Sequence, residues 1–281
     1  MEVDRINQYD NNFVSLENIK NLLNPSIQQL DSLLVFISEN RKEILQLYVD
    51  QIKNDFDNQL RKEQGYSNIY DNYERNVELD LLHSYPNLLR NMRIMLETYF
   101  NLRQYNINPD DDEIEIKAFD RFKGRKIPHY IYLLSLTKIL PRKETIELYK
   151  EFLEVSVKHH QVNSPYMETV DGMLELYKEH FPKTHIFSLF KIQDGKVGCK
   201  LTRCMIYEVF EDFDPSFDKE IGFLTSCYND YTHARSVNKH FILTRNKTIM
   251  EGEDVCDFCW HDIQLIESVE HPTKEFWDTI E

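Results

Sequence analysis

The residues best suited to chemistry are five cysteines, all of which lie between Cys199 and Cys259 in a chain of 281 residues. Free cysteine is also a common core residue, so any single one is more often structural than reactive. Cys227 and Asp230 are three residues apart and share a face if the run 219–231 forms one helix. A carboxylate beside a thiol raises the thiol pKa, which favours Asp230 as a base or substrate anchor.

The last of these cysteines lie in the run 255–266, whose apolar pattern predicts a strand. Alternation divides its side chains between two faces, with Cys256, Phe258 and Trp260 on one and Asp257, Cys259 and His261 on the other. Only one face can line a given pocket. The choice of reactive cysteine depends on which face does so.

A zinc site is a competing interpretation of the same cysteines. Cys256 and Cys259 could join Cys199 and Cys204, but 51 residues separate the two pairs. Zinc ribbons favour ~15–20 residues there, and strand alternation sends the last two thiols to opposite faces. We therefore expect no metal, and the acidic run Asp110–Asp112 and the pair His159–His160 are interpreted as helix-end charges.

Residues 1–182 are expected to form a mostly helical region. Leu45, Val49, Ile52 and Phe56 recur with helical spacing, and Pro86 starts or kinks a long helix that runs to about residue 100. Further helices are expected over the nearly all-apolar run 127–139 and, in sequence order, over 144–157 and 167–180.

Residues 183–281 are expected to form an α+β region with a small antiparallel sheet. Two apolar runs, 185–192 and 197–201, flank Asp194-Gly195, which is a hairpin signal. Helices are expected over 203–210 and 219–231, and strands over 241–245 and 255–266. The fold class is therefore α+β, with the helical region packed against the mixed one.

Composition excludes several classes of function. The net charge of −15 disfavours nucleic acid and anionic lipid as partners, because both need a basic surface. Only seven glycines occur, and no phosphate-loop, dinucleotide or Gly-x-Ser-x-Gly pattern is present. No secretory signal or apolar run of ~18 residues occurs, so we expect a cytoplasmic protein with reduced thiols.

Three short motifs near the end of the chain carry a family resemblance. Phe241-Ile-Leu-Thr-Arg245, Ile249-Met-Glu-Gly252 and Cys256-Asp257-Phe258 together resemble the C-terminal signature of the L-2-amino-thiazoline-4-carboxylic acid hydrolase family. Upstream, Thr202-Arg203-Cys204 and Cys227-Tyr-Asn-Asp230 are consistent with it. The resemblance covers about residues 185–262 and is weak over the helical half.

The resemblance implies hydrolysis of a small cyclic carbon–nitrogen compound, as in opening a thiazoline ring to N-carbamoyl-L-cysteine. A thiolate, or water activated by Asp230, would add to the ring carbon between nitrogen and sulfur, and the ring thiolate would leave. Cys256 is the first choice of nucleophile and Cys227 the second. Arg245 or Arg203 would bind the substrate carboxylate. Asp257 is expected either at the substrate or in support of the strand.

Other interpretations stay open at this stage. Arg245 could form a surface salt bridge, and Cys204 could serve core packing. Gly252 could serve only a turn. The whole region could be a non-catalytic module that binds a small carboxylated ligand or a metal, or a divergent hydrolase fold with another substrate in specialised metabolism. No cofactor is expected, and oligomeric state is open.

Overall fold

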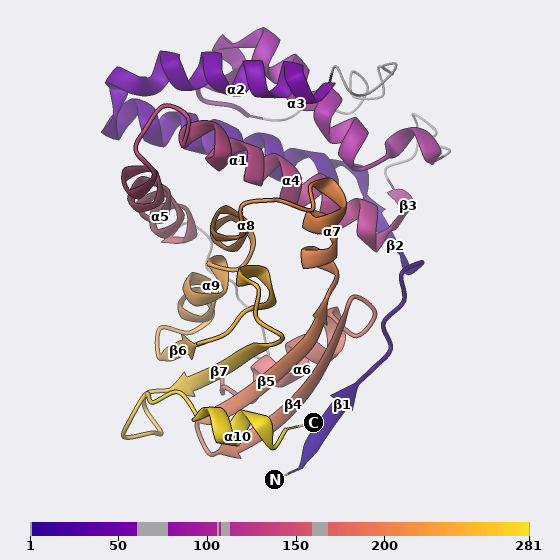
Figure 1. Cartoon of the computed structure of the whole chain (residues 1–281), viewed down its shortest axis with the longest axis vertical. Helices are drawn as coiled ribbons and strands as arrows, with labels where there is room; N and C mark the ends of the chain where they lie inside the picture. Colours follow the sequence, from indigo (N-terminus) through magenta and orange to yellow (C-terminus); the bar gives the residue numbers. More distant parts are fainter. Residues whose placement is uncertain (1, 61–77, 106, 108–112, 159–167, 281) are drawn as a thin grey trace. The chain divides into compact units, whose positions relative to one another are not determined.

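The computed structural model describes residues 2–60, 78–105, 107, 113–158 and 168–280. It has an α+β fold, as the sequence predicts (Figure 1). Its contacts form two compact units, one made of residues 1–13 and 153–281 and the other of residues 14–152. The acidic run at 110–112 and the histidine pair at 159–160 lie outside the described residues.

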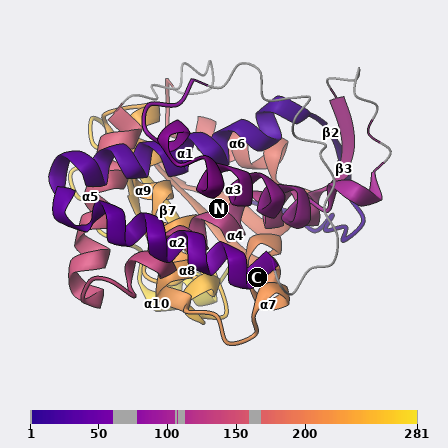
Figure 2. The same ribbon diagram turned by 90° about the horizontal axis from the view of Figure 1, so that it is seen from above.

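The unit of residues 14–152 is a helical bundle with a short two-stranded sheet. Asn18 caps its first helix by accepting hydrogen bonds from the backbone amides of Lys20 and Asn21. The long helices pack against one another along their apolar faces (Figure 2). Its elements are β2 (Val14–Asn18), α1 (Ile19–Asn40), η1 (Lys42–Ile44), α2 (Leu45–Leu60), η3 (Leu82–Ser84), α3 (Pro86–Tyr99), η4 (Leu102–Gln104), β3 (Glu113–Lys117), α4 (Ala118–Leu136) and most of α5 (Arg142–Lys158).

Several predicted helices of this unit are present. Tyr48, Val49, Ile52 and Phe56 are buried on one face of α2. Helix α3 begins at Pro86, a position where the backbone N–H that proline lacks would have no partner within the helix. The mostly helical region expected over residues 1–182 also contains strands that were not predicted, and in this unit these are β2 and β3. These strands pair antiparallel with each other, and β3 has the alternating sequence Glu113-Ile-Glu-Ile-Lys117, which buries Ile114 and Ile116 on one face.

The other unit is built on a five-stranded antiparallel sheet in the order β1-β4-β5-β7-β6. Asp194-Gly195 forms the predicted hairpin turn between β4 and β5, and Gly195 has a φ of 75°, which favours glycine. Its elements are β1 (Val3–Ile6), α6 (Gly172–His180), β4 (His185–Gln193), β5 (Lys196–Cys204), α7 (Met205–Phe213), α8 (Lys219–Ser226), α9 (Asn229–Val237), β6 (Phe241–Thr244), η5 (Ile249–Glu251), β7 (Cys256–Asp262) and α10 (Lys274–Asp278).

The division between the units differs from the expected boundary near residue 183. Val170 and Met173 lie beside the sheet in the same apolar core as Phe187 of β4, so α6 packs with the mixed unit. At the other end of the chain, β1 pairs with β4 and adds an edge strand. Sequence periodicity predicts neither association. β1 and β4 are far apart in the chain, and α6 is a helix that packs on a sheet rather than on the helices before it.

Two expected elements of the mixed unit needed correction. The run 219–231 is two helices rather than one, because α8 ends at Ser226 and α9 begins at Asn229. The expected helix at 203–210 begins only at Met205, and residues 203 and 204 extend β5. Both differences move residues that the sequence singled out for chemistry.

Candidate active site

One face of the five-stranded sheet, called the thiol face, collects most of the cysteines. Cys199 of β5 and Cys256 of β7 are members of its apolar core, and Cys204 packs against that core. Helices α6 and α9 cover this face through residues such as Met173 and Ala234. Charge interactions link its groups, since the pKa values of Cys204, Cys227 and Cys256 all respond to Asp230.

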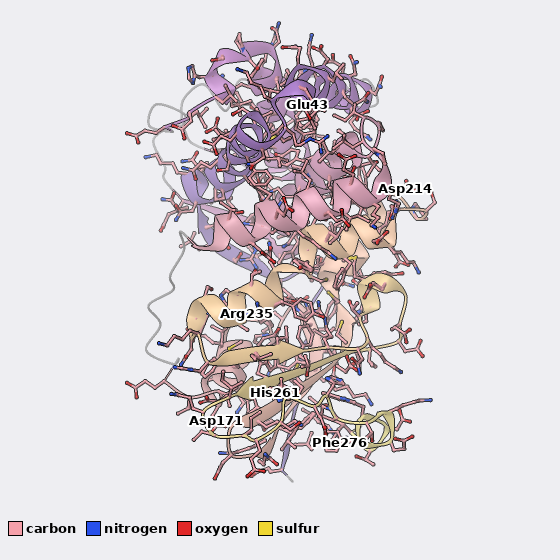
Figure 3. The ribbon with its side chains drawn as sticks, turned by 90° about the vertical axis from the view of Figure 1, so that its left-hand side faces the viewer. Glu43, Asp171, Asp214, Arg235, His261 and Phe276 are labelled. Atoms are coloured by element: carbon pink, nitrogen blue, oxygen red, sulfur yellow. The ribbon has the colours of Figure 1, made fainter. Side chains whose placement is uncertain are left out.

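The predicted division of β7 is present. Cys256, Phe258 and Trp260 belong to the core of the thiol face, whereas Cys259 packs with Phe190 and Trp277 in a separate cluster beneath α10. Figure 3 shows the sheet edge-on, with His261 on β7 and Phe276 on α10. Cys259 is therefore separated from Cys199, Cys204 and Cys256, which share the thiol face, so the four sulfurs do not gather around one point. Within the described residues, no group of three His, Cys, Asp or Glu side chains could hold a metal ion.

Cys204 lies directly opposite His185 across the β4–β5 pair. Its Sγ is 3.4 Å from His185 Nε2, as expected for cross-strand partners on one face. A bulge creates this pairing: Ile186 pairs with Arg203 and Phe187 with Leu201, so Thr202 is the extra residue. Without the bulge, alternation from Leu201 would place Arg203 rather than Cys204 on the thiol face.

The His185 ring is held from its other nitrogen. Thr184 Oγ1 lies 2.8 Å from His185 Nδ1 and also 3.4 Å from the carbonyl oxygen of Phe181. The Phe181 ring meets the imidazole edge-on, with 5.1 Å between ring centroids. Burial lowers the pKa of His185 to about 3, so the imidazole is neutral at physiological pH.

Cys204 also lies at the N-terminal end of α7. Burial raises the pKa of its thiol to about 12, while the backbone amides of Ile206 and Tyr207 oppose that rise without forming a capping hydrogen bond. The partial positive charge of a helix N-terminus favours negative charge on the sulfur. Cys204 is half-buried, as is Cys227, whereas Cys199, Cys256 and Cys259 are buried.

Cys256, the first choice of nucleophile from the sequence, is 5% exposed. Its sulfur accepts a hydrogen bond of 3.2 Å from the backbone amide of Ile249 and lies 3.6 Å from Thr248 Oγ1. Burial is the main cause that raises its pKa. The contacts with Ile249 and Thr248 and the nearby Arg245 guanidinium oppose that rise, and the same contacts attach η5 to the start of β7.

Cys227 and Asp230 do not share one helix, as the sequence had suggested. Cys227 ends α8 and Asp230 lies in the first turn of α9, where a carboxylate suits the helix dipole. Burial raises the pKa of Cys227 well above its usual value, and the Asp230 carboxylate raises it further while Arg245 lowers it. The two residues are nevertheless near neighbours through Arg245.

Arg245 is buried, which overturns the surface salt-bridge interpretation. Its side chain is 1% exposed and donates from Nη1 to Asp230 Oδ2 over 2.8 Å, and from Nη2 to the Cys227 carbonyl oxygen over 3.0 Å. The guanidinium lies within about 5 Å of three aromatic rings, those of Phe223, Tyr231 and Phe258. Its Nε has no hydrogen-bond partner among the described residues.

Arg203 has a different setting from Arg245. Its side chain is 42% exposed, and its Nε donates to Glu208 over 2.6 Å. The guanidinium stacks on the Tyr9 ring at 3.8 Å, and Tyr9 OH also donates to Glu208. The Tyr9 pKa responds to Cys204, which places this half-exposed guanidinium in the neighbourhood of the Cys204 thiol.

Asp257 points to the opposite side of the sheet from Cys256. Its carboxylate accepts hydrogen bonds from the backbone amides of Asn246 and Lys247, and it lies 3.1 Å from His271 Nε2. A cavity of about 250 Å³ lies beside it. Basic residues in its lining are Lys200, Lys247 and Lys274, and acidic ones are Asp254, Asp257 and Asp278.

No chemistry was predicted for His185 from the sequence, and core packing was one interpretation of Cys204. The signal available was a cysteine directly before a helix, in Thr202-Arg203-Cys204. Its histidine partner could not be identified without the strand register, which depends on the bulge at Thr202. In a β4–β5 hairpin without the bulge, His185 would lie opposite Arg203 instead of Cys204.

Comparison with known proteins agrees with the sequence resemblance. Residues 127–260 match the family model described as L-2-amino-thiazoline-4-carboxylic acid hydrolase. The matched range contains β4 to β6 and most of β7, and thus every cysteine, Arg203, Asp230 and Arg245. No significant match is found among curated proteins or among solved structures. In the described part of the chain, no helix is both long and apolar enough to span a membrane.

Proposed function

We propose that this protein hydrolyses a small heterocycle at a carbon bonded to nitrogen and sulfur, in the manner of 2-aminothiazoline-4-carboxylate opening to N-carbamoyl-cysteine. The observation that carries the proposal is the match of residues 127–260 to a hydrolase family, over the segment that gathers thiols on one sheet face with the Asp230 carboxylate of α9 nearby. The name of the family gives the reaction type. The cysteine thiols and the nearby Asp230 carboxylate are the groups that would serve as nucleophile and base.

The reaction begins with addition to the ring carbon. That carbon is amidine-like and electrophilic, so a thiol or a water molecule can add to it while a base removes the proton. The tetrahedral centre then expels the ring sulfur as a thiolate, whose conjugate acid has a pKa near ~8.5. Water supplies the oxygen of the carbamoyl product. This chemistry needs no cofactor.

Asp230 is the carboxylate best placed to contact the substrate. Its side chain is 36% exposed, and the buried Arg245 fixes one of its oxygens. A half-exposed carboxylate of this kind can bind the protonated amidine of the ring or accept a proton from water. Arg245 then acts as a positioning residue rather than as the carboxylate anchor that the sequence had suggested.

Arg203 is the better anchor for a substrate carboxylate. Arg203 directly precedes Cys204 in the chain, and its side chain is half-exposed. The side chain of Arg245, in contrast, is buried. Glu208 and Tyr9 hold part of the Arg203 guanidinium, and its solvent-exposed part is the one that would contact a carboxylate. A small carboxylated molecule is therefore the proposed substrate class.

The test is incubation of the full chain with 2-aminothiazoline-4-carboxylate, with detection of N-carbamoyl-cysteine by mass spectrometry. Wild type is expected to form the product, and Asp230→Asn is expected to slow it at least about a hundredfold. Asp194→Asn is the matched control, because Asp194 is 92% exposed at the β4–β5 turn. Absence of product from the wild type would refute this substrate.

A second candidate function is binding of a small zwitterion without catalysis. The cavity beside Asp257 favours it, because about 250 Å³ lined by three lysines and three aspartates can pair both charges of such a ligand. No cysteine lines it. Titration calorimetry with amino acids on wild type and Lys247→Ala tests this function, and unchanged binding in the variant would contradict it.

A further inference from the structure

The environment of Cys204 differs from that of the other four thiols, and the difference bears on catalysis. Cys199 and Cys256 are members of the apolar core, and Cys259 lies on the opposite face under α10. Cys227 is half-buried, but its neighbours are the Asp230 carboxylate and the Arg245 guanidinium. An anionic neighbour that is held by an arginine is a poor base for a thiol.

We propose that Cys204 is the nucleophile of this site, that His185 is its general base and that Thr184 orients the imidazole. The assignment rests on the proposed hydrolytic function and deepens it. Geometry carries it: Cys204 Sγ is 3.4 Å from His185 Nε2, and Thr184 Oγ1 is 2.8 Å from His185 Nδ1. A nucleophile, a base and a third group that orients the base are the signature of covalent hydrolases.

The hydrogen bonds of Thr184 select the useful tautomer. If its hydroxyl donates to the Phe181 carbonyl oxygen, its oxygen accepts the proton of His185 Nδ1. The lone pair of Nε2 then faces the Cys204 thiol and can accept its proton. Thr184 is 1% exposed and His185 is 4% exposed, so the hydrogen bond between them is shielded from bulk solvent.

The backbone holds this arrangement in place. His185 and Cys204 are direct partners at the open end of the β4–β5 hairpin, and the bulge at Thr202 sets their common face. The backbone amide of Met205 donates to the Thr184 carbonyl oxygen over 3.1 Å, which closes the ladder where β5 becomes α7. The amides of the first turn of α7 then face charge that develops at the sulfur.

The covalent steps conserve atoms, electrons and protons. The sulfur of Cys204 bonds to the ring carbon as its proton passes to His185 Nε2, and the bond from that carbon to the ring sulfur breaks. The protonated imidazole returns its proton to the departing ring sulfur, which leaves an isothiourea on Cys204. Water then adds to the same carbon as His185 takes its proton. His185 returns that proton to the departing Cys204 sulfur, and the proton of the added hydroxyl passes to the former ring nitrogen, so Cys204 leaves as the thiol and the product carries a urea carbonyl.

Site-resolved alkylation of the full chain with iodoacetamide tests the pair without any substrate. Cys204 is expected to react faster than Cys227, the other half-buried thiol. His185→Gln is expected to slow labelling of Cys204 by about tenfold or more, because the base is lost, and to leave Cys227 within about twofold. Thr184→Val, which keeps the side-chain shape, is expected to slow Cys204 by a smaller factor. Labelling of Cys204 that is unchanged in both variants would overturn the assignment.

Turnover of 2-aminothiazoline-4-carboxylate by Cys204→Ala and Cys227→Ala separates this proposal from the proposed function. Loss of at least about a hundredfold in Cys204→Ala alone, with circular dichroism unchanged, supports the assignment. Ring opening that persists in Cys204→Ala overturns it and leaves the hydrolase function in place. If wild type leaves the ring intact while His185→Gln still slows Cys204 labelling, the substrate is wrong and the pair stands.

Discussion

The buried ion pair of Arg245 and Asp230 is expected to stabilise the mixed unit more than a surface pair does. The guanidinium is 1% exposed, and its Nη1 is 2.8 Å from the carboxylate. Two unit charges ~4 Å apart attract by about 4 kcal/mol at an effective dielectric constant of ~20. Asp230 is 36% exposed, so water screens part of that attraction and about 2 kcal/mol of coupling is expected.

A double-mutant cycle with Arg245→Met and Asp230→Asn measures this coupling in the free energy of unfolding, from urea transitions at pH 7. Asp230→Asn alone is expected to destabilise most, because it leaves a buried guanidinium without its counter-charge. Arg245→Met leaves a carboxylate that water can reach. The double variant should therefore be less destabilised than the sum of the single variants.

The exposed pair of Lys143 and Glu147 in α5 provides a matched control. Its side chains are 89% and 61% exposed, and their charged atoms are 3.9 Å apart. A coupling of about 0.3–0.5 kcal/mol is expected there. If the Arg245–Asp230 cycle gives a coupling free energy no larger than that of this control, the three aromatic rings rather than Asp230 stabilise the guanidinium. The role of Arg245 in positioning Asp230 is then refuted.

Three further predictions concern stability. Burial lowers the pKa of His185 to about 3, so the neutral imidazole contributes stability that is present above pH ~6.5 and is lost as the pH falls. Between pH ~6.5 and ~5, the wild type should lose about 1.5 kcal/mol more than His185→Gln in its free energy of unfolding, and equal losses would contradict this. Gly252→Ala should cost about 1–2 kcal/mol in urea unfolding because φ is 99°, whereas a cost near zero would mean that the turn relaxes. Asp31→Asn should cost about 2–3 kcal/mol because one carboxylate accepts from the backbone amides of residues 80–82; an unchanged unfolding midpoint would refute that role.

Much of the fold follows from local patterns in the sequence. The helical spacing in α2, Pro86 at the start of α3 and the Asp194-Gly195 turn each report a local preference, and each is present. β1 was missed because its four residues acquire their structure from the distant β4, and β2 and β3 were missed although part of each alternates, because they are short and lie among helices. The boundary of the mixed unit depends on the same long-range pairing.

The candidate site could be predicted only in part. Strand alternation correctly separated Cys256 from Asp257 and Cys259 on β7. The pairing of Cys204 with His185 depends on one extra residue, Thr202, and nothing in the sequence marks a bulge there. Likewise, the break between α8 and α9 lies at Cys227 and Tyr228, neither of which is a helix breaker.

The most direct test of covalent hydrolysis by Cys204 is trapping of the intermediate on the full-length chain. Rapid acid quench during turnover of 2-aminothiazoline-4-carboxylate, followed by peptide mass spectrometry, locates the sulfur that carries the substrate. We expect an adduct on Cys204 that is absent from Cys204→Ala and that is still present in Cys256→Ser. An adduct on Cys256 or Cys227, with Cys204 unmodified, would contradict the assignment.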